Sequence, residues 1–499
     1  MARRFLCILL MLCMLLCCGC DEVPDPTDDF VVDDGVTAPT TPDEALVFSL
    51  PYSHDDTLNP FSAATEVNLQ LSHLLYDSLT VIGDGYMPQL SLAASVERPD
   101  PTHLVVTLRE GAVFSDGSDV TPDDVVKSFK QAQTSAHYST LLSNVTAAKA
   151  DKKKRQITFT LASADIHADA CLTFPVMKAA TLTDKAAKAP IGGGLYRLEQ
   201  ADSGLKLVKN PHHPAEVNYA EIALQHLPNT AARYYALASG KLAYYFDDLS
   251  EGDTSRITGA NKPVALNAMV FMGVNSAHLQ LALPEVRQAL NLLLDRTAVA
   301  AVYAEHGTVS ASPLPTAWAP MAALTTALPE EQDSDAATAL LEQAGYPLTG
   351  KKIPELRLVY NSDRDDRAVV AEQIRSQASA VGIKITLLPL SEAEYRQALE
   401  DGEYELYVAE YRFGTNMSLR SLLLGGKTSY GVAKDSAAAA AYTAYLSGAS
   451  SLQDFLDTFG TDVPFIPLCY RGGVAAYDRR LTAVTPTGYN PYHGIAGWQ

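Results

Sequence analysis

Side chains that do chemistry in enzymes occur along the chain, but their spacing does not build a catalytic centre. The sequence has no G-x-S-x-G nucleophile elbow, no H-E-x-x-H zinc motif and no Walker loop. The glycines of Gly192–Gly194 lack the Lys-Ser/Thr pair of a phosphate loop, and His212–His213 lack spaced partners for zinc. The acid pairs Asp123–Asp124 and Asp247–Asp248 are adjacent in sequence, which suits helix caps and turns. We therefore predict no catalytic residue, no metal site and no cofactor.

Length and charge restrict the class of protein. A chain of 499 residues exceeds what one hydrophobic core organises, so we expect two or three lobes. Hydrophobic residues make up 47% and charged residues 19%, an ordinary mixture for a soluble globular protein. A formal net charge of -20 argues against nucleic-acid binding, because that function needs a basic face.

The N-terminus is typical of an export signal. Arg3 and Arg4 precede the apolar run Phe5–Leu16, which is too short for a comfortable membrane span. The run ends in a Gly-Cys step that resembles a lipobox, so residues 1–20 are predicted to be a lipoprotein signal peptide. We expect Cys20 to become the first residue and to carry diacylglycerol on a thioether. Modification at Cys18, or an unlipidated secretory signal, is the alternative.

A tether is predicted to follow the signal peptide. Asp21–Glu44 is rich in Asp, Pro and Thr, contains no Lys or Arg and has no hydrophobic periodicity, which indicates disorder. The body would then lie at the outer face of the cytoplasmic membrane, in a periplasm or at the cell surface, held by its lipid alone. Only Cys171 and Cys469 remain in the body, and a disulfide bond between them is left open.

The element with the clearest local signals lies in the first third of the body. Alternation predicts a strand over Leu104–Leu108, and Asp116–Gly117 predicts a turn. Thr121 as N-cap and Pro122 at the first helical position then predict a helix with acids in its first turn. The helix would bury Val125, Val126 and Phe129.

The second half of the chain is predicted to continue with α/β structure. An amphipathic helix is expected over Leu283–Val302, where Arg287 and Asp295–Arg296 are interpreted as members of intrahelical or interlobe ion pairs. Gly345 is expected to end another helix. A βαβ unit is predicted from the later segments Leu356–Tyr360, Ala368–Val381 and Ile383–Leu387.

The order of residues over Leu104–Lys130 resembles the signature region of family 5 extracellular solute-binding proteins. These are the oligopeptide-, dipeptide- and nickel-binding subunits of ABC importers. The resemblance implies an α/β, periplasmic-binding-protein-like fold (type II, cluster C), with two large α/β lobes around a ligand cleft and an additional inserted lobe. Similar matches recur at Pro190–Tyr196, Leu283–Val302, Asp335–Tyr346 and Val463–Leu468.

The resemblance also implies the lobes and the function. Lobe I would combine 45–80, 190–266 and 463–499, lobe II would be the insertion 81–189, and lobe III would be 267–462. The chain would capture a peptide or peptide-like solute by lobe closure and, as a monomer, deliver it to ABC permease subunits. A nickel chelate, an oligosaccharide or another organic solute, a sensor role and an extracytoplasmic enzyme are the alternatives.

The ligand residues expected from the resemblance lie on the first loop, on an aromatic segment, on the strand that enters lobe III and on a lobe III loop. They are Thr65, Glu66, Tyr138, Met272, Glu410, Tyr411, Arg412, Phe413, Thr415 and Asn416. For Glu66 and Tyr138, a solvated position and ordinary packing are the respective alternatives.

The lobe III loop bears on selectivity. In peptide-binding relatives an acid in this loop takes the free amine, but Tyr411–Ser418 contains no acid. Because an unpaired buried ammonium costs several kcal/mol, we expect a ligand other than a simple dipeptide or tripeptide with a free amine. Arg412 suits a carboxylate instead, unless it points to solvent or pairs with Glu410. Glu410 or Glu66 could substitute for the missing acid.

Overall fold

The computed structural model of the protein describes most of the chain beyond the N-terminal region. The described residues are 46–183, 188–202, 204–250, 259–326, 328–346, 355–425, 429–433 and 435–499. The predicted signal peptide, Cys20 and the predicted tether lie outside these ranges. The chain divides into two units, Met1–Leu46 and Val47–Gln499, and every element below belongs to the second. Among the described residues, no helix combines the length and apolar character needed to cross a bilayer.

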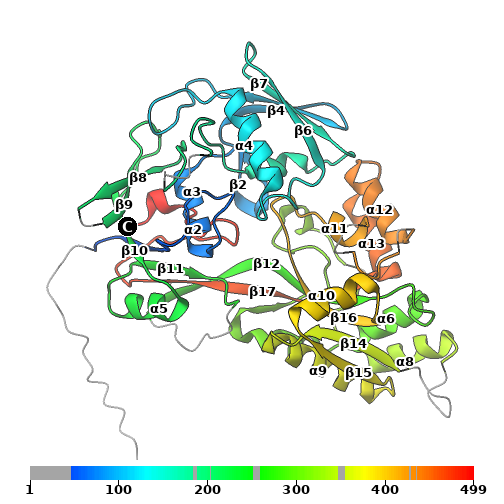
Figure 1. Cartoon of the computed structure of the whole chain (residues 1–499). Helices are drawn as coiled ribbons and strands as arrows, with labels where there is room; N and C mark the ends of the chain where they lie inside the picture. The colour runs from blue at the N-terminus through cyan, green and yellow to red at the C-terminus, as the bar shows by residue number, and fades with distance from the viewer. Residues whose placement is uncertain are drawn as a thin grey trace, which may run out of the picture. The chain divides into compact units, whose positions relative to one another are not determined.

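A seven-stranded mixed sheet organises this unit, with the order β11-β17-β12-β16-β14-β15 and β13 paired to β17. Its strands are β11 (Tyr244–Asp247), β12 (Ala260–Val274), β13 (Gly307–Val309), β14 (Leu356–Asn361), β15 (Ile385–Leu390), β16 (Leu406–Arg412) and β17 (Phe465–Tyr477). β14 runs parallel to β15 and β16, whereas β12 runs antiparallel to β16 and β17. The long strands β12 and β17 lie side by side (Figure 1).

The β12–β17 pair is interrupted at one point. The register shifts between Ala265 and Ala268, and Asn267 adopts a positive φ of 52°. Gly472 and Gly473 lie opposite this bulge, where a Cβ on Gly473 would come within 2.6 Å of the Asp247 carbonyl oxygen. A bulge bends its strand and disturbs the ladder, so this is where the ribbon can flex. The predicted boundary at residue 267 falls here.

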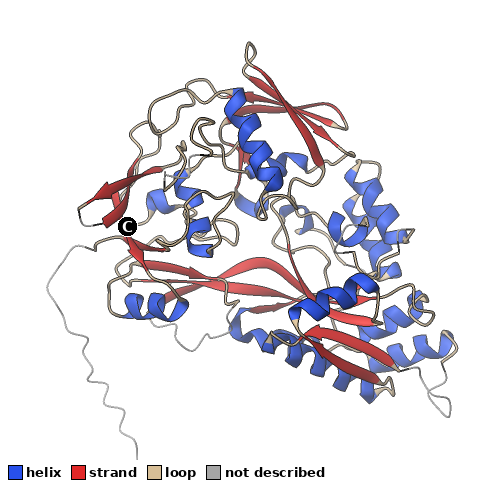
Figure 2. Ribbon diagram, viewed as in Figure 1, coloured by secondary structure: helices blue, strands red, loops and turns tan. Residues whose placement is uncertain are grey.

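Helices cover both faces of the parallel strands. β14, α9 (Asp365–Ala380) and β15 form the predicted βαβ unit, which is confirmed. α10 (Glu392–Asp401) follows β15 and returns the chain to β16, and it packs on the face opposite α9 (Figure 2). From β14 the chain continues to β15 on one side of β14 and then to β16 on its other side. This reversal of strand order creates a topological switch point at the carboxyl ends of these strands.

Three further sheets of the described residues lie outside the central one. β1 (Ser49–Tyr52), β8 (Tyr196–Ala201), β9 (Gly204–Lys209) and β10 (Glu221–His226) form one, with β1 parallel to β10. β4 (Ala93–Asp100), β5 (His103–Leu108), β6 (Val145–Asp151) and β7 (Gln156–Leu161) form an antiparallel sheet. β2 (Thr80–Ile82) pairs with β3 (Pro88–Leu90). The lobe boundaries proposed from the sequence stay a prediction, and the central sheet takes strands from both proposed lobes I and III.

The remaining helices are short. They are α2 (Glu66–Gln70), α3 (Ser72–Leu75), α4 (Pro122–Thr134), α5 (Thr230–Ala238), α6 (Pro284–Leu292), α7 (Arg296–Ala300), α8 (Ser334–Gln343), α11 (Arg420–Leu423), α12 (Ala437–Leu446) and α13 (Leu452–Asp462), with 3-10 turns η1 (Asp84–Tyr86), η2 (Ala168–Thr173), η3 (Ala301–His306), η4 (Ala319–Met321) and η5 (Ile495–Gly497).

Local signals in the sequence correspond to observed structure. α4 begins with a capping box between Thr121 and Asp124, and Pro122 is its first residue. Gly345 follows α8 with a φ of 86°, as expected of a residue that ends a helix. The only two cysteines of the body, Cys171 and Cys469, are free and buried, so no disulfide joins them.

Candidate ligand-binding site

A cavity of about 330 Å³ lies where α2, β2, the end of β16 and the segment 488–491 meet. Its volume is at the lower end of the range of ligand pockets, ~300–1,000 Å³. Arg412 at the carboxyl end of β16 lines it, together with Gly414 and Thr415 of the loop that follows. Its polar lining includes Glu66, Gln70, Tyr138, Arg412, Thr415 and Tyr489.

Four of the ten predicted ligand residues line this cavity, namely Glu66, Tyr138, Arg412 and Thr415. They come from α2, from the segment after α4 and from the end of β16 with its following loop. The fold therefore brings together residues that are more than 300 positions apart in the sequence. That grouping agrees with the expected cleft, and the binding role of each residue remains a prediction.

The other six predicted residues do not line it. Thr65 donates its hydroxyl to the Asp56 carboxylate at 2.7 Å and precedes α2. Met272 is fully buried within β12, and Phe413 is 2% exposed because it packs into the core against Tyr470. The six are Thr65, Met272, Glu410, Tyr411, Phe413 and Asn416.

Glu410 is committed to a buried ion-pair cluster. One carboxylate oxygen accepts hydrogen bonds from Arg367 at 2.6 Å and from Arg471 at 2.9 Å. Burial alone would raise the pKa of Glu410, but the two guanidinium groups outweigh it and hold the pKa below its ordinary value. Since both arginines are buried, a ligand amine would have to displace them. Glu410 is therefore a poor substitute for the missing acid of the loop.

Arg412 is the last residue of β16 rather than a loop residue. Its guanidinium donates to the Asp248 carboxylate at 2.7 Å, so it neither points freely to solvent nor pairs with Glu410. Burial would raise the pKa of Asp248, but Arg412 outweighs it and the pKa is lowered. Asp248 was interpreted from the sequence as a turn residue, and it also accepts the backbone N–H of Ser250. Its partnership with Arg412 left no signal in the local sequence.

Glu66 is the acid that remains without a cation. It is the first residue of α2, its side chain is exposed in the cavity, and no ion pair joins it to any described residue. Its one hydrogen bond comes from the Gln70 carboxamide at 3.4 Å. The enclosing protein raises the pKa of Glu66, the negative charge of Asp248 adds to this, and Arg412 opposes it. When Glu66 is ionised, the carboxylates of Glu66 and Asp248 and the guanidinium of Arg412 together carry one excess negative charge.

A second set of contacts joins the segment 163–173 to the segment 415–446. Thr415 donates to the Ala170 carbonyl at 2.6 Å, and the Asn416 carboxamide donates to the Cys171 sulfur at 3.3 Å. Arg420 donates to the Ala164 carbonyl at 2.9 Å. These bonds do not need a ligand, so they hold two faces of the protein together beside the cavity.

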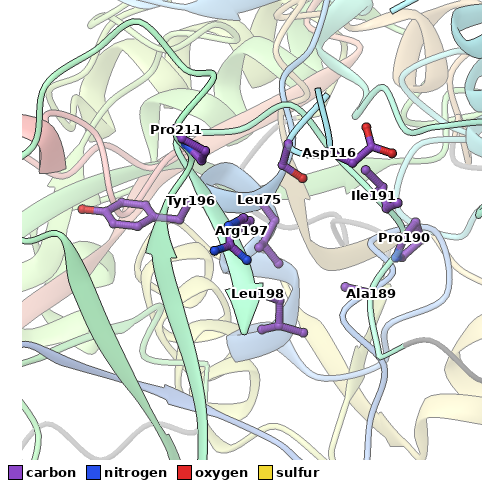
Figure 3. Close-up of a pocket in the computed structure, with 11 residues that line it drawn as sticks. Leu75, Asp116, Ala189, Pro190, Ile191, Tyr196, Arg197, Leu198 and Pro211 are labelled. Atoms are coloured by element: carbon purple, nitrogen blue, oxygen red, sulfur yellow. The ribbon is translucent and has the colours of Figure 1, made fainter. Parts of the chain in front are cut away.

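Two further cavities carry weaker arguments for a ligand. One, of about 470 Å³, lies between Ser115–Asp116, Ala189–Gly192 and β8 (Figure 3). Its charged side chains are already paired, Asp116 with Lys178 and Arg197 with Glu199. Gly192 is required there, since a Cβ would lie 2.2 Å from the Leu75 carbonyl oxygen.

The third cavity, about 380 Å³, lies between α10 and β16. Glu410 and Tyr411 line it, together with Tyr395, Tyr407 and Tyr430. The hydroxyls of Tyr395, Tyr407 and Tyr411 donate hydrogen bonds to backbone carbonyls of the protein. These tyrosines would therefore contact a ligand mainly through their aromatic rings.

One group of described residues has metal-like spacing. His54, Asp55 and His226 place their ligand atoms within 4.8 Å of one another, and all three are exposed. The His226 Nδ1 atom accepts the backbone N–H of His54, and the His54 Nε2 atom lies 3.0 Å from the Asp55 carboxylate. A metal ion would have to replace these contacts. His212–His213 are not part of the group.

Comparisons with known proteins agree with the geometry. The model of the family described as "Bacterial extracellular solute-binding proteins, family 5 Middle" matches residues 87–427. Heme-binding protein A of Haemophilus influenzae is 24% identical over 337 residues, covering 59% of this chain and 60% of that protein. Oligopeptide-binding protein AppA of Bacillus subtilis is 24% identical over 379 residues, covering 68% of this chain and 66% of that protein. The matches thus span less than two thirds of these relatives.

Solved structures show the same fold. The unliganded open form of the periplasmic murein tripeptide-binding protein MppA superimposes with a TM-score of 0.74 at 17% identity, covering 90% of this chain and 96% of that one. HbpA2 from Haemophilus parasuis gives a TM-score of 0.73 at 18% identity, covering 91% and 99%. At these identities the likeness concerns the fold alone.

Proposed function

Because the chain belongs to the family 5 bacterial extracellular solute-binding proteins, we propose that it captures a peptide or peptide-like solute outside the cytoplasmic membrane. It would deliver this solute to the permease of an ABC importer, acting as a monomer held to the membrane by a lipid anchor. The supporting observation is the cavity at the carboxyl end of β16. Glu66 of α2 and Arg412 of β16, which are far apart in the sequence, both line it.

Binding without turnover is supported by the chemistry of the described residues. The family is one of binding proteins. Burial raises the pKa of Cys469 to about 12 and also raises that of Cys171, so neither thiol is a ready nucleophile. The cavity lining contains His73 and His137 but no cysteine, and His137 is anchored to the Ala63 carbonyl at 2.8 Å.

The small molecules that copurify with the protein test this function. Native purification followed by denaturation and mass spectrometry is expected to release a peptide or peptide-like compound. The same compound should rebind to the stripped protein in calorimetry with unit stoichiometry. Recovery of a chemically converted product after incubation would show an enzyme instead, and rebinding only of a non-peptide solute would overturn the proposed ligand class.

Closure on the ligand is a testable consequence. The bonds between 163–173 and 415–446 lie on one side of the cavity, and the bulge at Asn267 lies in the ribbon that joins the two regions. We expect the ligand-free protein to populate a wider form, and small-angle scattering to show a smaller radius of gyration when the copurified solute is added. An unchanged radius at saturating solute would contradict closure at this hinge.

Lipid attachment is tested by Cys20→Ser. The charged, apolar, Gly-Cys order at the N-terminus motivates the prediction. The variant should leave the membrane fraction and lose the mass of the diacylglycerol group. Cys18→Ser is the matched control and should stay attached. A Cys20→Ser protein that still sediments with membranes would contradict this assignment.

A further inference from the structure

We propose that the solute carries a primary ammonium group and that this group docks on the Glu66 carboxylate of α2. The inference rests on the proposed function and adds the chemistry of the ligand to it. It adopts the alternative that an acid outside the lobe III loop takes the amine, and it departs from the expectation of a ligand without a free amine.

The first argument is the charge of the site. Glu66 is the only carboxylate among the described residues that line the cavity. The one cation in this lining, Arg412, already donates to Asp248 at 2.7 Å. A ligand carboxylate would therefore meet a neutralised guanidinium, whereas a ligand ammonium would meet a carboxylate that lacks a counter-ion.

The second argument is the elimination of other acids. The loop Tyr411–Ser418 contains none, and Glu410 binds the buried Arg367 and Arg471 through a single oxygen. Removing Glu410 from that cluster would leave the buried Arg471 without its carboxylate partner and Arg367 with Asp366 alone, at 3.4 Å. Among the described acids at this cavity, Glu66 is the one that can take a cation without breaking an existing ion pair.

The third argument is the polar neighbour of Glu66. Gln70 is 4% exposed, lines the cavity and directs its carboxamide nitrogen to Glu66 at 3.4 Å. Its carboxamide oxygen has no hydrogen-bond partner in the structure. Gln70 thus gives the Glu66 carboxylate one neutral donor and no charge, whereas an ammonium group would supply three N–H donors and a positive charge.

The protonation of Glu66 gives the proposal a second readout. The enclosing protein and Asp248 raise its pKa, so docking of a cation should favour the ionised form and release a proton. The charged and titratable groups that act on Glu66 or line its cavity are Asp248, Arg412, His73, His137, Tyr138, Tyr489 and Tyr492. Burial lowers the pKa of His73 to about 4, so it stays neutral over most of the pH range used below. Affinity for an amine should therefore fall as the pH drops through the raised pKa of Glu66.

The test compares two libraries on ligand-stripped protein. One contains dipeptides and tripeptides with free N-termini and without lysine, and the other contains the same peptides after N-acetylation. Bound peptides are identified by mass spectrometry, and the best binder is measured by calorimetry from pH 4 to pH 8. We expect the free-amine peptide to bind about 10- to 100-fold more tightly than its acetylated form, as for the loss of one charged hydrogen-bonded contact.

Variants assign the contact. Glu66→Gln should lose about the same 10- to 100-fold in affinity for the free-amine peptide and lose the pH dependence, while Glu66→Asp should keep that dependence. Glu372→Gln, an exposed glutamate on α9, is the control and should leave both unchanged. Equal binding of both libraries, or full affinity in Glu66→Gln, would overturn the ammonium site and leave the proposed function standing. Binding of neither library would also overturn the ammonium site, whereas the proposed function is overturned only if no peptide or peptide-like compound copurifies and rebinds.

Discussion

Replacing Glu410 by alanine is expected to lower the free energy of unfolding by about 3–5 kcal/mol, the usual cost of removing one partner from a buried ion pair. The carboxylate accepts bonds from Arg367 and Arg471, whose side chains are 7% and 3% exposed. Without it, two guanidinium groups stay buried with too few acceptors, although Arg367 also donates to the Tyr303 hydroxyl at 2.7 Å. Chemical denaturation with a fixed m-value would measure the loss.

Two further measurements distinguish the loss of the buried Glu410 ion pairs from the effect of replacing a surface glutamate. Glu372→Ala removes an exposed pair with Arg375 and should change the free energy of unfolding by less than about 1 kcal/mol. The pKa of Glu410 is lowered in the folded protein, so its contribution is present above the unfolded pKa and is lost as pH falls through the folded pKa. The gap between wild type and Glu410→Ala should therefore narrow below about pH 4. A loss no larger than that of Glu372→Ala would contradict the cluster's role.

Arg296→Leu is expected to cost at least about 3 kcal/mol, because several buried acceptors lose their donor together. Arg296 is 1% exposed. Its guanidinium donates to the Pro467 carbonyl at 3.0 Å, to the Asn291 side-chain oxygen at 2.5 Å and to the Pro329 carbonyl at 3.3 Å. Burial lowers the pKa of Arg296 to about 10, so the group stays charged at neutral pH.

Lysine at this position should not rescue stability. A single ammonium on a flexible stem cannot reach acceptors on β17, α6 and the segment before α8 at once. Arg296→Lys is therefore expected to lower the free energy of unfolding by nearly as much as Arg296→Leu does. Thermal unfolding and denaturant midpoints would measure both losses. Arg375→Leu on the surface of α9 is the matched control. A free energy of unfolding for Arg296→Leu within about 1 kcal/mol of wild type would contradict the prediction. It would mean that removing the buried charge compensates for the lost hydrogen bonds.

The features that could be predicted from the sequence are those that neighbouring residues determine. Thr121 and Asp124 lie three positions apart and form the capping box that their types predict. The βαβ unit was recognised from alternating and helical periodicities, and the family from the order of residues over Leu104–Lys130. Arg287 forms an ion pair, with Asp462 at 2.8 Å, but this partner lies at the end of α13 within the predicted lobe III, so the pair is neither intrahelical nor between lobes as predicted.

The features that could not be predicted depend on residues that meet only in the folded chain. Arg412 and Asp248 are 164 positions apart, and Glu410 and Arg471 are 61 apart. No local pattern connects such partners, so a side chain that looks available in the sequence can be neutralised in the structure. The interpretation of Arg296 as an ion-pair residue was wrong for a related reason, since carbonyl oxygens, which have no sequence signature, accept most of its bonds.

The pairing of β12 with β17 also has a consequence for how the chain reaches its native state. β12 ends at Val274 and β11 at Asp247, yet both take a neighbour from Phe465–Tyr477 near the C-terminus. Closing so long a loop is entropically costly, and contacts of such sequence separation slow folding. The central sheet cannot be completed until almost the whole chain has been synthesised and exported. A product that stops before Phe465 would keep the edges of β11 and β12 unpaired, and should be cleared by proteolysis rather than accumulate as a smaller folded protein.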